Sequence, residues 1–412
     1  MKPEKTAVLA RLDELSRCGR YELGIDRPLG SPQERAAREL FARWSRAGGY
    51  ALSQDRVGNL FARRMGTDST AAPILVGSHL DSVKTGGAYD GAYGVVGALC
   101  ALELLDARSI ETSHPLEAVA WVGEEGSRFP LGCLGSSVFA GITSTEQALR
   151  LTDDVGISLA EALLSDGGGL LHGVALRESD AVAGYLELHI EQGPMLDDAG
   201  ASIGIVTAIA GQRRYRVIVE GVSGHAGTVP MNRRSDALCS ACELILALEE
   251  AARSIGAMVV TVGRLLVEPN GTNVIPGRVI FSIDARSPDE PRIDEMEKRL
   301  QGAIQEMQVR RTVSVTLECL ETRTAAPMHA HLREALGRAV ARLGERSLEI
   351  ASGAGHDAMC LSRIAPTAML FVPSIGGHSH VSQEATSDAD LELGVFALAE
   401  SLVEVDRYLN EK

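Results

Sequence analysis

The stretch Gly77–Gly94, GSHLDSVKTGGAYDGAYG, connects two apolar segments of the chain. The run before it, AAPILV at 71–76, predicts a buried strand, and the Ala- and Leu-rich segment 95–105 predicts a helix. In open α/β sheets, sites form in the crevice beyond the carboxyl ends of the strands. The stretch follows a strand end and carries His, Asp and Gly. It therefore predicts an α/β fold with a polar site at that edge.

His79, Asp81 and Asp90 give this stretch the composition of a metal site. Histidine supplies a neutral nitrogen ligand and aspartate a charged oxygen ligand, a set suited to zinc or manganese. Because Asp81 lies two residues after His79, both side chains would face the same way along a strand, and Asp81 could orient the imidazole by contacting the ring nitrogen that does not bind the metal. The alternative is a Gly- and Asp-rich turn in which Asp90 caps the helix.

Length and charge restrict the class of protein. A chain of 412 residues is too long for one ordinary core, so we expect two domains. The net charge of −15 argues against nucleic acid as the main partner. No apolar stretch is long enough to span a membrane. The first residues lack the uninterrupted apolar core of a signal peptide, which predicts a cytoplasmic location.

The cysteines predict reduced thiols, since their number, seven, is odd and the chain is long. Cys239 and Cys242 form a CxxC motif, but it falls in a helical pattern without a second pair at zinc-ribbon spacing. We therefore expect both to be small buried residues.

A second acidic group follows another apolar run. Residues 116–122, LEAVAWV, predict a strand that leads directly into Glu124 and Glu125. Adjacent side chains at a strand end point to opposite sides, so one carboxylate can bind a metal while the other faces the substrate and moves a proton. A charged turn is the alternative. The placement repeats the strand-then-acidic-loop order of the first stretch.

The segment 185–194, YLELHIEQGP, alternates apolar and polar residues and predicts a half-buried strand. His189 would share a face of that strand with Glu187 and Glu191. A structural histidine is the alternative unless another residue group requires it as a ligand.

The composition changes near residue 208 and predicts an inserted domain. The order strand, helix, two strands, helix, strand suggests a separate α+β domain, whereas residues 142–180 predict helices and loops with little chemistry. The predicted domains are 1–207 with 326–412, and 208–325. The predicted elements of the insert are strands at 213–220, 258–267, 278–284 and 312–320, and helices ending near 250 and spanning 292–307.

Several motifs together resemble the M20 metallopeptidase-like amidohydrolases, especially the branch of N-carbamoyl-L-amino acid amidohydrolases, allantoate amidohydrolase and β-ureidopropionase. The resemblance implies an α/β metal-binding catalytic domain with a mixed, mostly parallel sheet flanked by helices. It also implies an inserted α+β lid and dimerisation domain with an antiparallel sheet. The motifs, in chain order, are GSHLDS, GGAYDGAYGV, Glu124-Glu125 with GSRFP, LELHIEQGP, SGHAGTVPM, NVIPG and SGAGHDA.

The resemblance implies two divalent metal ions per subunit, zinc or else manganese, cobalt or nickel. Glu124 would be the general base that takes a proton from the attacking water. The five implied ligands are His79 and His189 for one ion, Glu125 and His380 for the other, and Asp90 as the bridge between them.

The resemblance also implies substrate contacts. His225 would stabilise the developing oxyanion, within its own subunit or in the partner's site, and a homodimer would form through the inserted domain. Asn273 and Arg286 would hold a carboxylate, for which an arginine fork is well suited. A surface charge at a strand end is the alternative for Arg286. Plausible contacts to the ureido group are Gln212, Gly355 and His356.

One departure affects the last metal ligand. This branch typically has Asn-Pro after the final histidine, whereas Val381 and Ser382 follow here. Because Glu384 is retained, we assign His380 rather than His378.

The predicted function is binuclear metal-dependent hydrolysis of a carbamoyl or ureido C–N bond in a small-molecule substrate. The alternatives are an M20 aminoacylase or dipeptidase, and a catalytically silent binding protein that kept the fold.

Overall fold

Two units make up the chain in the computed structural model, which describes residues 6–165, 170–177 and 181–411. The first unit comprises residues 1–207 and 328–412, and the second comprises 208–327. The chain thus enters the second unit at the residue expected from the sequence, and it returns two residues later than expected.

A mixed sheet forms the centre of the first unit, in the order β9-β19-β8-β5-β6-β4-β3-β7, with β18 beside β9; its last strand, β17, pairs with the end of β9 within residues 208–327. Its middle strands β19, β8, β5 and β6 are parallel neighbours. The flanking pairs are antiparallel except for β3 with β7, so the sheet is mixed, with a parallel centre. The strands are β3 (Ala51–Gln54), β4 (Leu60–Arg64), β5 (Ile74–His79), β6 (Leu116–Trp121), β7 (Ala175–Leu176), β8 (Gly184–Ile190), β9 (Ile203–Ile209), β17 (Ala326–Pro327), β18 (Ser347–Ser352) and β19 (Thr367–Val372), with a hairpin of β1 (Arg20–Tyr21) and β2 (Gly24–Ile25) outside it.

Helices cover this sheet and confirm the α/β class. α1, α2, α3, α10 and α12 share one large apolar core with the strands, and α4, α5 and α6 enclose a smaller cluster. The parallel strands are buried along their whole length, as expected for a sheet covered on both faces. The helices are α1 (Val8–Ser16), α2 (Pro32–Ala47), α3 (Ala92–Ala107), α4 (Leu134–Phe139), α5 (Thr145–Leu149), α6 (Leu159–Leu164), α7 (Met195–Ala199), α10 (Ala330–Arg342), α11 (Ala358–Leu361) and α12 (Asp388–Asn410).

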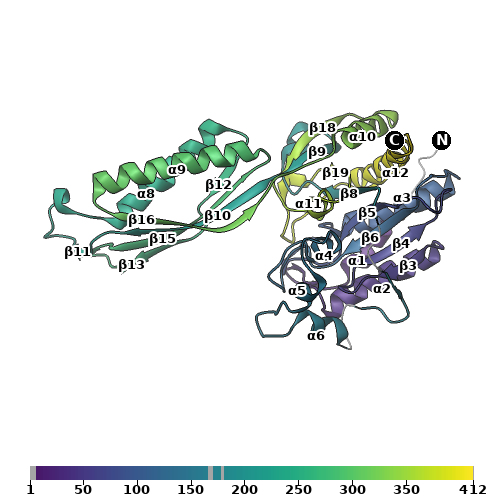
Figure 1. Cartoon of the computed structure of the whole chain (residues 1–412), viewed down its shortest axis with the longest axis horizontal. Helices are drawn as coiled ribbons and strands as arrows, with labels where there is room; N and C mark the ends of the chain where they lie inside the picture. The colour runs from purple at the N-terminus through teal and green to yellow at the C-terminus, as the bar shows by residue number, and fades with distance from the viewer. Residues whose placement is uncertain (1–5, 166–169, 178–180, 412) are drawn as a thin grey trace. The chain divides into compact units, whose positions relative to one another are not determined.

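The second unit is an antiparallel sheet with two helices, α8 and α9, that run side by side (Figure 1). Alternate residues of β10 and β15 point into a core that also receives the apolar stripes of both helices. The long elements follow the predicted order, and the two-residue strands β11 and β14 are additional. They are β10 (Gly211–Glu220), β11 (Gly224–His225), α8 (Ala237–Ile255), β12 (Val259–Thr261), β13 (Leu265–Glu268), β14 (Val274–Ile275), β15 (Arg278–Ser287), α9 (Glu290–Arg311) and β16 (Ser314–Arg323).

Two sequence predictions for this unit were wrong. The strand expected at 258–267 is divided into β12 and β13. Thr261 pairs with Asp284 and Leu265 pairs with Phe281, so four residue steps on one side oppose three steps along β15. The extra residue forces a bulge that interrupts the strand.

Cys239 and Cys242 are exposed rather than buried. The helical period of α8 turns Ala241, Leu244 and Leu248 to the core and leaves the CxxC on the exposed side.

The segment predicted as helices and loops, 142–180, contains α5 and α6, while its residues 166–169 and 178–180 lie outside the described part of the chain. Within the described ranges, no helix combines the length and the apolar character needed to cross a membrane.

Close contact between α3 and β8 depends on a glycine. A Cβ atom at Gly94 would lie 2.3 Å from the carbonyl oxygen of Leu188 and 2.6 Å from Cβ of Ser78. Only a glycine lets the first turn of α3 approach the two strands this closely.

We predict that Gly94→Ala lowers the free energy of unfolding by about 1–3 kcal/mol, as overpacking does in a dense core. The matched control is Gly337→Ala in α10, where the added Cβ would meet Ile205 Cδ1 at 3.7 Å, an ordinary contact. This control should gain about 0.5–1 kcal/mol, since alanine is a better helix former. Denaturant unfolding followed by circular dichroism measures both, and equal stability of the two variants would contradict the account.

Candidate metal centre

The four parallel strands deliver the site residues to one edge of the sheet. The pairing of β5 with β8 in register places His79 opposite His189 when it is continued to the strand ends. Glu124 and Glu125 follow the neighbouring strand β6, and His380 lies in the loop that follows β19. The carboxyl ends of parallel strands share an edge, so segments far apart in sequence meet there.

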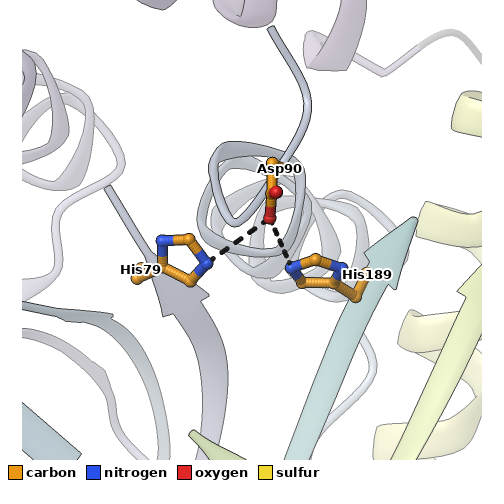
Figure 2. Close-up of side chains that lie close together, drawn as sticks. All are labelled: His79, Asp90 and His189. Carbon is orange, nitrogen blue, oxygen red and sulfur yellow. Dashed lines mark ion pairs between the residues drawn. The ribbon is translucent and has the colours of Figure 1, made fainter. Parts of the chain in front are cut away.

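Asp90 lies at the centre of this group and presents a different oxygen to each side. Its Oδ1 lies 3.6 Å from Nε2 of His79 and 3.2 Å from Nε2 of His189 (Figure 2). Its Oδ2 lies 3.1 Å from Nε2 of His380, which is 3.6 Å from Oε2 of Glu125. These residues form two groups, one of His79, Asp90 and His189 and one of Asp90, Glu125 and His380. Within each group the ligand atoms lie within 4.8 Å of one another, and Asp90 belongs to both groups. The structure therefore brings together all five predicted ligands.

Main-chain carbonyls orient two of the imidazoles. Nδ1 of His79 lies 3.0 Å from the carbonyl oxygen of Asp81, and Nδ1 of His189 lies 2.8 Å from that of Ile190. A carbonyl can only accept, so each Nδ1 carries a hydrogen, and the Nε2 lone pair is available on the side that faces Asp90. This is the arrangement that fixes the tautomer of metal-binding histidines.

The residue after Asp90 has to be glycine. Gly91 has φ = 62°, and a Cβ atom there would lie 2.4 Å from ring atoms of His79. The chain can therefore turn from Asp90 into α3 and still leave space for the imidazole. The N-terminus of this helix, which carries partial positive charge, adjoins the carboxylate.

Asp81 acts differently from the expectation. β5 ends at His79, so the two-residue alternation does not extend to Asp81. Its carboxylate accepts hydrogen bonds from the backbone N–H groups of Glu124, at 3.1 Å, and Glu125, at 3.2 Å. Oδ1 lies 3.7 Å from Nδ1 of His79. Asp81 thus orients the imidazole of His79 through its carbonyl, and its side chain holds the loop that carries Glu124 and Glu125, here called the acidic loop.

The buried charged groups of the site shift one another's pKa values. Burial acts to raise the pKa of Asp90, but the neighbouring imidazoles of His189, His380 and His79 hold it well below its ordinary value. Burial, with the charges of Asp90 and Glu124, raises the pKa of Glu125 well above its usual range. Burial also raises the pKa of Glu124, and the nearby imidazole of His79 opposes the shift.

These residues fit divalent cations. Oε1 of Glu125 is buried and has no hydrogen-bond partner among the described residues. Oxygen and imidazole nitrogen atoms are the ligands that zinc and manganese take in proteins. A dication would also supply the positive charge that the buried carboxylates of Asp90 and Glu125 require.

Two further residues, for which the sequence pattern gave no role, hold Asp90 in place. Oε1 of Glu384 accepts hydrogen bonds from the backbone N–H groups of Tyr89, at 2.9 Å, and Asp90, at 3.1 Å. Nε2 of Gln192 donates to Oδ2 of Asp90 at 2.8 Å. In the sequence, Glu384 is only a retained residue of the motif after His380, and Gln192 follows His189 by three residues; these are the signals that could have identified them.

His356 packs against one of the predicted ligands, and Gly355 precedes it in the chain. The His356 ring is buried, packs at 4.6 Å between ring centroids against His189, and bonds to Ser352 Oγ at 2.8 Å. Burial and the neighbouring imidazole of His189 lower the pKa of His356 well below its ordinary value, so its ring is neutral. Gly355 is half-buried. As placed, His356 supports a predicted ligand, and its contact with a ureido group stays a prediction.

The other four residues predicted to contact the substrate lie in the second unit, where they form two pairs. Gln212 and Arg286 are direct partners across β10 and β15, and both bind the carboxylate of Asp284, at 2.8 Å and 2.9 Å. His225 is exposed on β11, where its partner Val274 directly follows Asn273.

β11 lies beyond the far end of β10 (Figure 1). The eight residue steps from Gln212 to Glu220 along β10 separate the two pairs by about 26 Å at the usual rise of a strand. A single small molecule cannot contact both pairs within one chain.

The chain is similar to known proteins over nearly its whole length. Residues 75–404 match Peptidase family M20/M25/M40. The N-carbamoyl-L-amino acid amidohydrolase of Geobacillus stearothermophilus is 38% identical over 392 residues, which are 94% of this chain and 95% of that protein. The allantoate amidohydrolase of Bacillus subtilis (strain 168) is 40% identical over 352 residues, 84% of each chain. A crystal structure of a hydantoinase/carbamoylase family amidase from Burkholderia multivorans superposes with a TM-score of 0.91, at 35% identity and 97% coverage of both chains.

We predict that two substitutions at the centre separate metal binding from turnover. Glu124→Gln should keep the metal of the parent and lose at least ~10² in kcat, because an amide cannot accept the proton of water. Asp90→Ala should lose metal and activity together, because both predicted groups of ligands share that carboxylate. Elemental analysis and ammonia release measure the two quantities. Near-parental kcat in a metal-replete Glu124→Gln variant would exclude the base, and full metal occupancy in Asp90→Ala would exclude the bridge.

Proposed function

The chain belongs to Peptidase family M20/M25/M40, and we propose that it is a binuclear metal-dependent amidohydrolase that cleaves a carbamoyl or ureido C–N bond. The family is metal-dependent, and the observation that carries the proposal is the division of Asp90 between two groups of ligands. One group is His79 and His189, and the other is Glu125 and His380.

The proposed substrates are N-carbamoyl-L-amino acids or a related ureido acid such as allantoate or N-carbamoyl-β-alanine. The supporting observation is that the relatives with these activities are 38% and 40% identical and cover most of the chain. For an N-carbamoyl amino acid, water adds to the carbonyl carbon and the C–N bond to the amino acid breaks. The carbamate that leaves decomposes, so the products are the amino acid, ammonia and CO2.

Bound cations would supply a Lewis acid that polarises the carbonyl and makes water acidic enough to react near neutral pH. Zinc, manganese, cobalt and nickel all suit this set of ligands. Glu124 takes the proton from the attacking water and delivers it to the leaving nitrogen. Its position beside His79, 3.8 Å from Oε2 to Nε2, and its raised pKa support this role.

Arg286 binds the substrate's carboxylate in this proposal, and Gln212, the predicted contact to the ureido group, lies beside it. They lie opposite each other on neighbouring strands, and a guanidinium offers two parallel donors to a carboxylate. Asp284 supports this role because it already holds both side chains in a fixed orientation, at 2.9 Å from Nε of Arg286 and 2.8 Å from Nε2 of Gln212.

We also propose a homodimer, in which His225 and Asn273 serve the site of the partner subunit. The separation of about 26 Å between these residues and the pair Gln212–Arg286 supports it, because one small substrate cannot reach both within a chain. His225 would stabilise the negative charge that develops on the carbonyl oxygen, and Asn273 would join Arg286 of the partner subunit in holding the substrate's carboxylate.

A substrate panel tests the proposed activity. Ammonia release should be observed with at least one of N-carbamoyl-L-amino acids, allantoate and N-carbamoyl-β-alanine, and it should be lost after chelation and restored by added divalent metal. Hydrolysis of dipeptides or N-acyl amino acids alone would instead make the protein a peptidase or aminoacylase.

Arg286→Ala should raise KM for carboxylate substrates roughly 10- to 150-fold, equivalent to about 1.5–3 kcal/mol for a charged hydrogen bond. The variant should also lose most of its preference for N-carbamoyl amino acids over their decarboxylated analogues, with unchanged metal content. The control is Arg299→Ala, which removes an arginine of α9 that pairs with Glu295 at 2.9 Å. If Arg286→Ala discriminates between the two substrates as well as the parent does, Arg286 is not the carboxylate clamp.

Complementation tests the shared site. His225→Ala and Glu124→Gln should each be inactive alone, and a mixture refolded or co-expressed at equal amounts should regain about a quarter of parental activity. Half of the dimers are then mixed, and each mixed dimer has one site with Glu124 from one subunit and His225 from the other. No recovery in a sample that sediments as mixed dimers would place His225 in the site of its own subunit.

A further inference from the structure

Cys133 lies at the start of α4, directly against the acidic loop. Its backbone N–H donates to the carbonyl of Glu124 at 2.8 Å, and the N–H of Leu134 donates to the carbonyl of Gly123 at 3.1 Å. Cys133 has φ = 51°, a left-handed conformation that costs free energy for a residue with a side chain. The first turn of α4 therefore fixes the backbone of the loop and turns the thiol toward it.

The thiol contacts the carboxylate itself. Sγ of Cys133 lies 3.2 Å from Oε1 of Glu124, and the other oxygen, Oε2, lies 3.8 Å from Nε2 of His79. The two oxygens of Glu124 thus have separate surroundings, one against the thiol and one toward the metal centre. Only an S–H group can donate here, and the contact with Cys360, together with burial, raises the pKa of Cys133 well above its ordinary value. The thiol therefore keeps its hydrogen at neutral pH.

We propose that Cys133 is a positioning residue for the reaction, whose thiol donates to Oε1 of Glu124 and thereby directs Oε2 at the attacking water. This inference rests on the proposed function, because it gives Glu124 the role of general base. A glutamate side chain has several rotatable bonds, and a catalytic group performs well only when its rotamer is fixed by its neighbours. The hydrogen bond from Cys133 fixes that rotamer without adding a charge.

The surroundings of Cys133 are rigid, which a positioning role requires. Cys133 and Cys360 are both buried and touch each other. Ser136, one turn along α4, donates to Oδ1 of Asp357 at 2.5 Å, and Asp357 is fully buried. Packing therefore holds Sγ in place, and its one hydrogen has two acceptors within reach, Oε1 of Glu124 and Sγ of Cys360. The other explanation is that Cys133 only fills space beneath the loop.

Two substitutions in the metal-loaded enzyme separate these explanations. Cys133→Ala removes the donor, and Cys133→Ser keeps a donor in a smaller side chain. We expect Cys133→Ala to lower kcat roughly tenfold, with KM and metal content unchanged, because the lost interaction is a hydrogen bond to a charged group. Cys133→Ser should restore kcat to within about threefold of the parent, since a hydroxyl donates at least as well as a thiol.

The control is Cys100→Ala, which removes a buried thiol of the main core and should leave kcat unchanged. Parental kcat in Cys133→Ala would overturn the proposal. Equal losses in the Ala and Ser variants, or a loss accompanied by lower metal content, would also overturn it, because both are expected of a packing role.

A double substitution links the effect to Glu124. In the background of Glu124→Asp, whose shorter side chain cannot keep the contact, Cys133→Ala should cause little further loss. An undiminished loss in that background would exclude an effect through Glu124. Failure of the proposed function has a different signature, since the parent itself would then release no ammonia from the substrate panel.

Discussion

The shared carboxylate of Asp90 is the interaction on which the arrangement of the site depends. One oxygen faces His79 and His189, and the other faces His380. Burying an acidic group in the same small volume as Glu125 costs several kcal/mol unless positive charge compensates it. Two cations beside Asp90 would provide this compensation, and the imidazoles fixed through Nδ1 are ready to bind them.

The fold supports that carboxylate with long-range contacts. Gly91 lets α3 begin beside the ring of His79, and Gly94 lets the same helix pack directly on β8. Glu384 bonds to the backbone of Asp90 from a segment almost 300 residues away in sequence. The parallel centre of the sheet brings these segments to one edge, while the second unit carries residues for binding the substrate in the proposed enzyme.

The sequence was sufficient to predict the site residues that follow apolar runs, because a strand end leaves a local pattern. His79, Asp90 and the pair Glu124–Glu125 were found in this way. The assignment of His189 and His380 needed the resemblance to a family, since a lone histidine on a strand or in a loop has no local signature.

Side-chain roles that depend on distant segments could not be predicted. Asp81 turns to the acidic loop because β5 ends before it, and Glu384, Gln192 and Cys133 act through contacts that no spacing in the sequence reveals. The helix α12, which packs on α3 and α10, was not predicted either. The exposed CxxC of α8 shows that a helical pattern predicts a helix better than it predicts which face is buried.

The most direct test of the central claim is anomalous diffraction from crystals grown with zinc or manganese, recorded at the absorption edge of the metal. The account predicts two peaks per subunit, one beside His79 and His189 and one beside Glu125 and His380, each within bonding distance of a different oxygen of Asp90. A single peak, or a second peak that does not contact Asp90, would contradict the claim that this carboxylate bridges two ions.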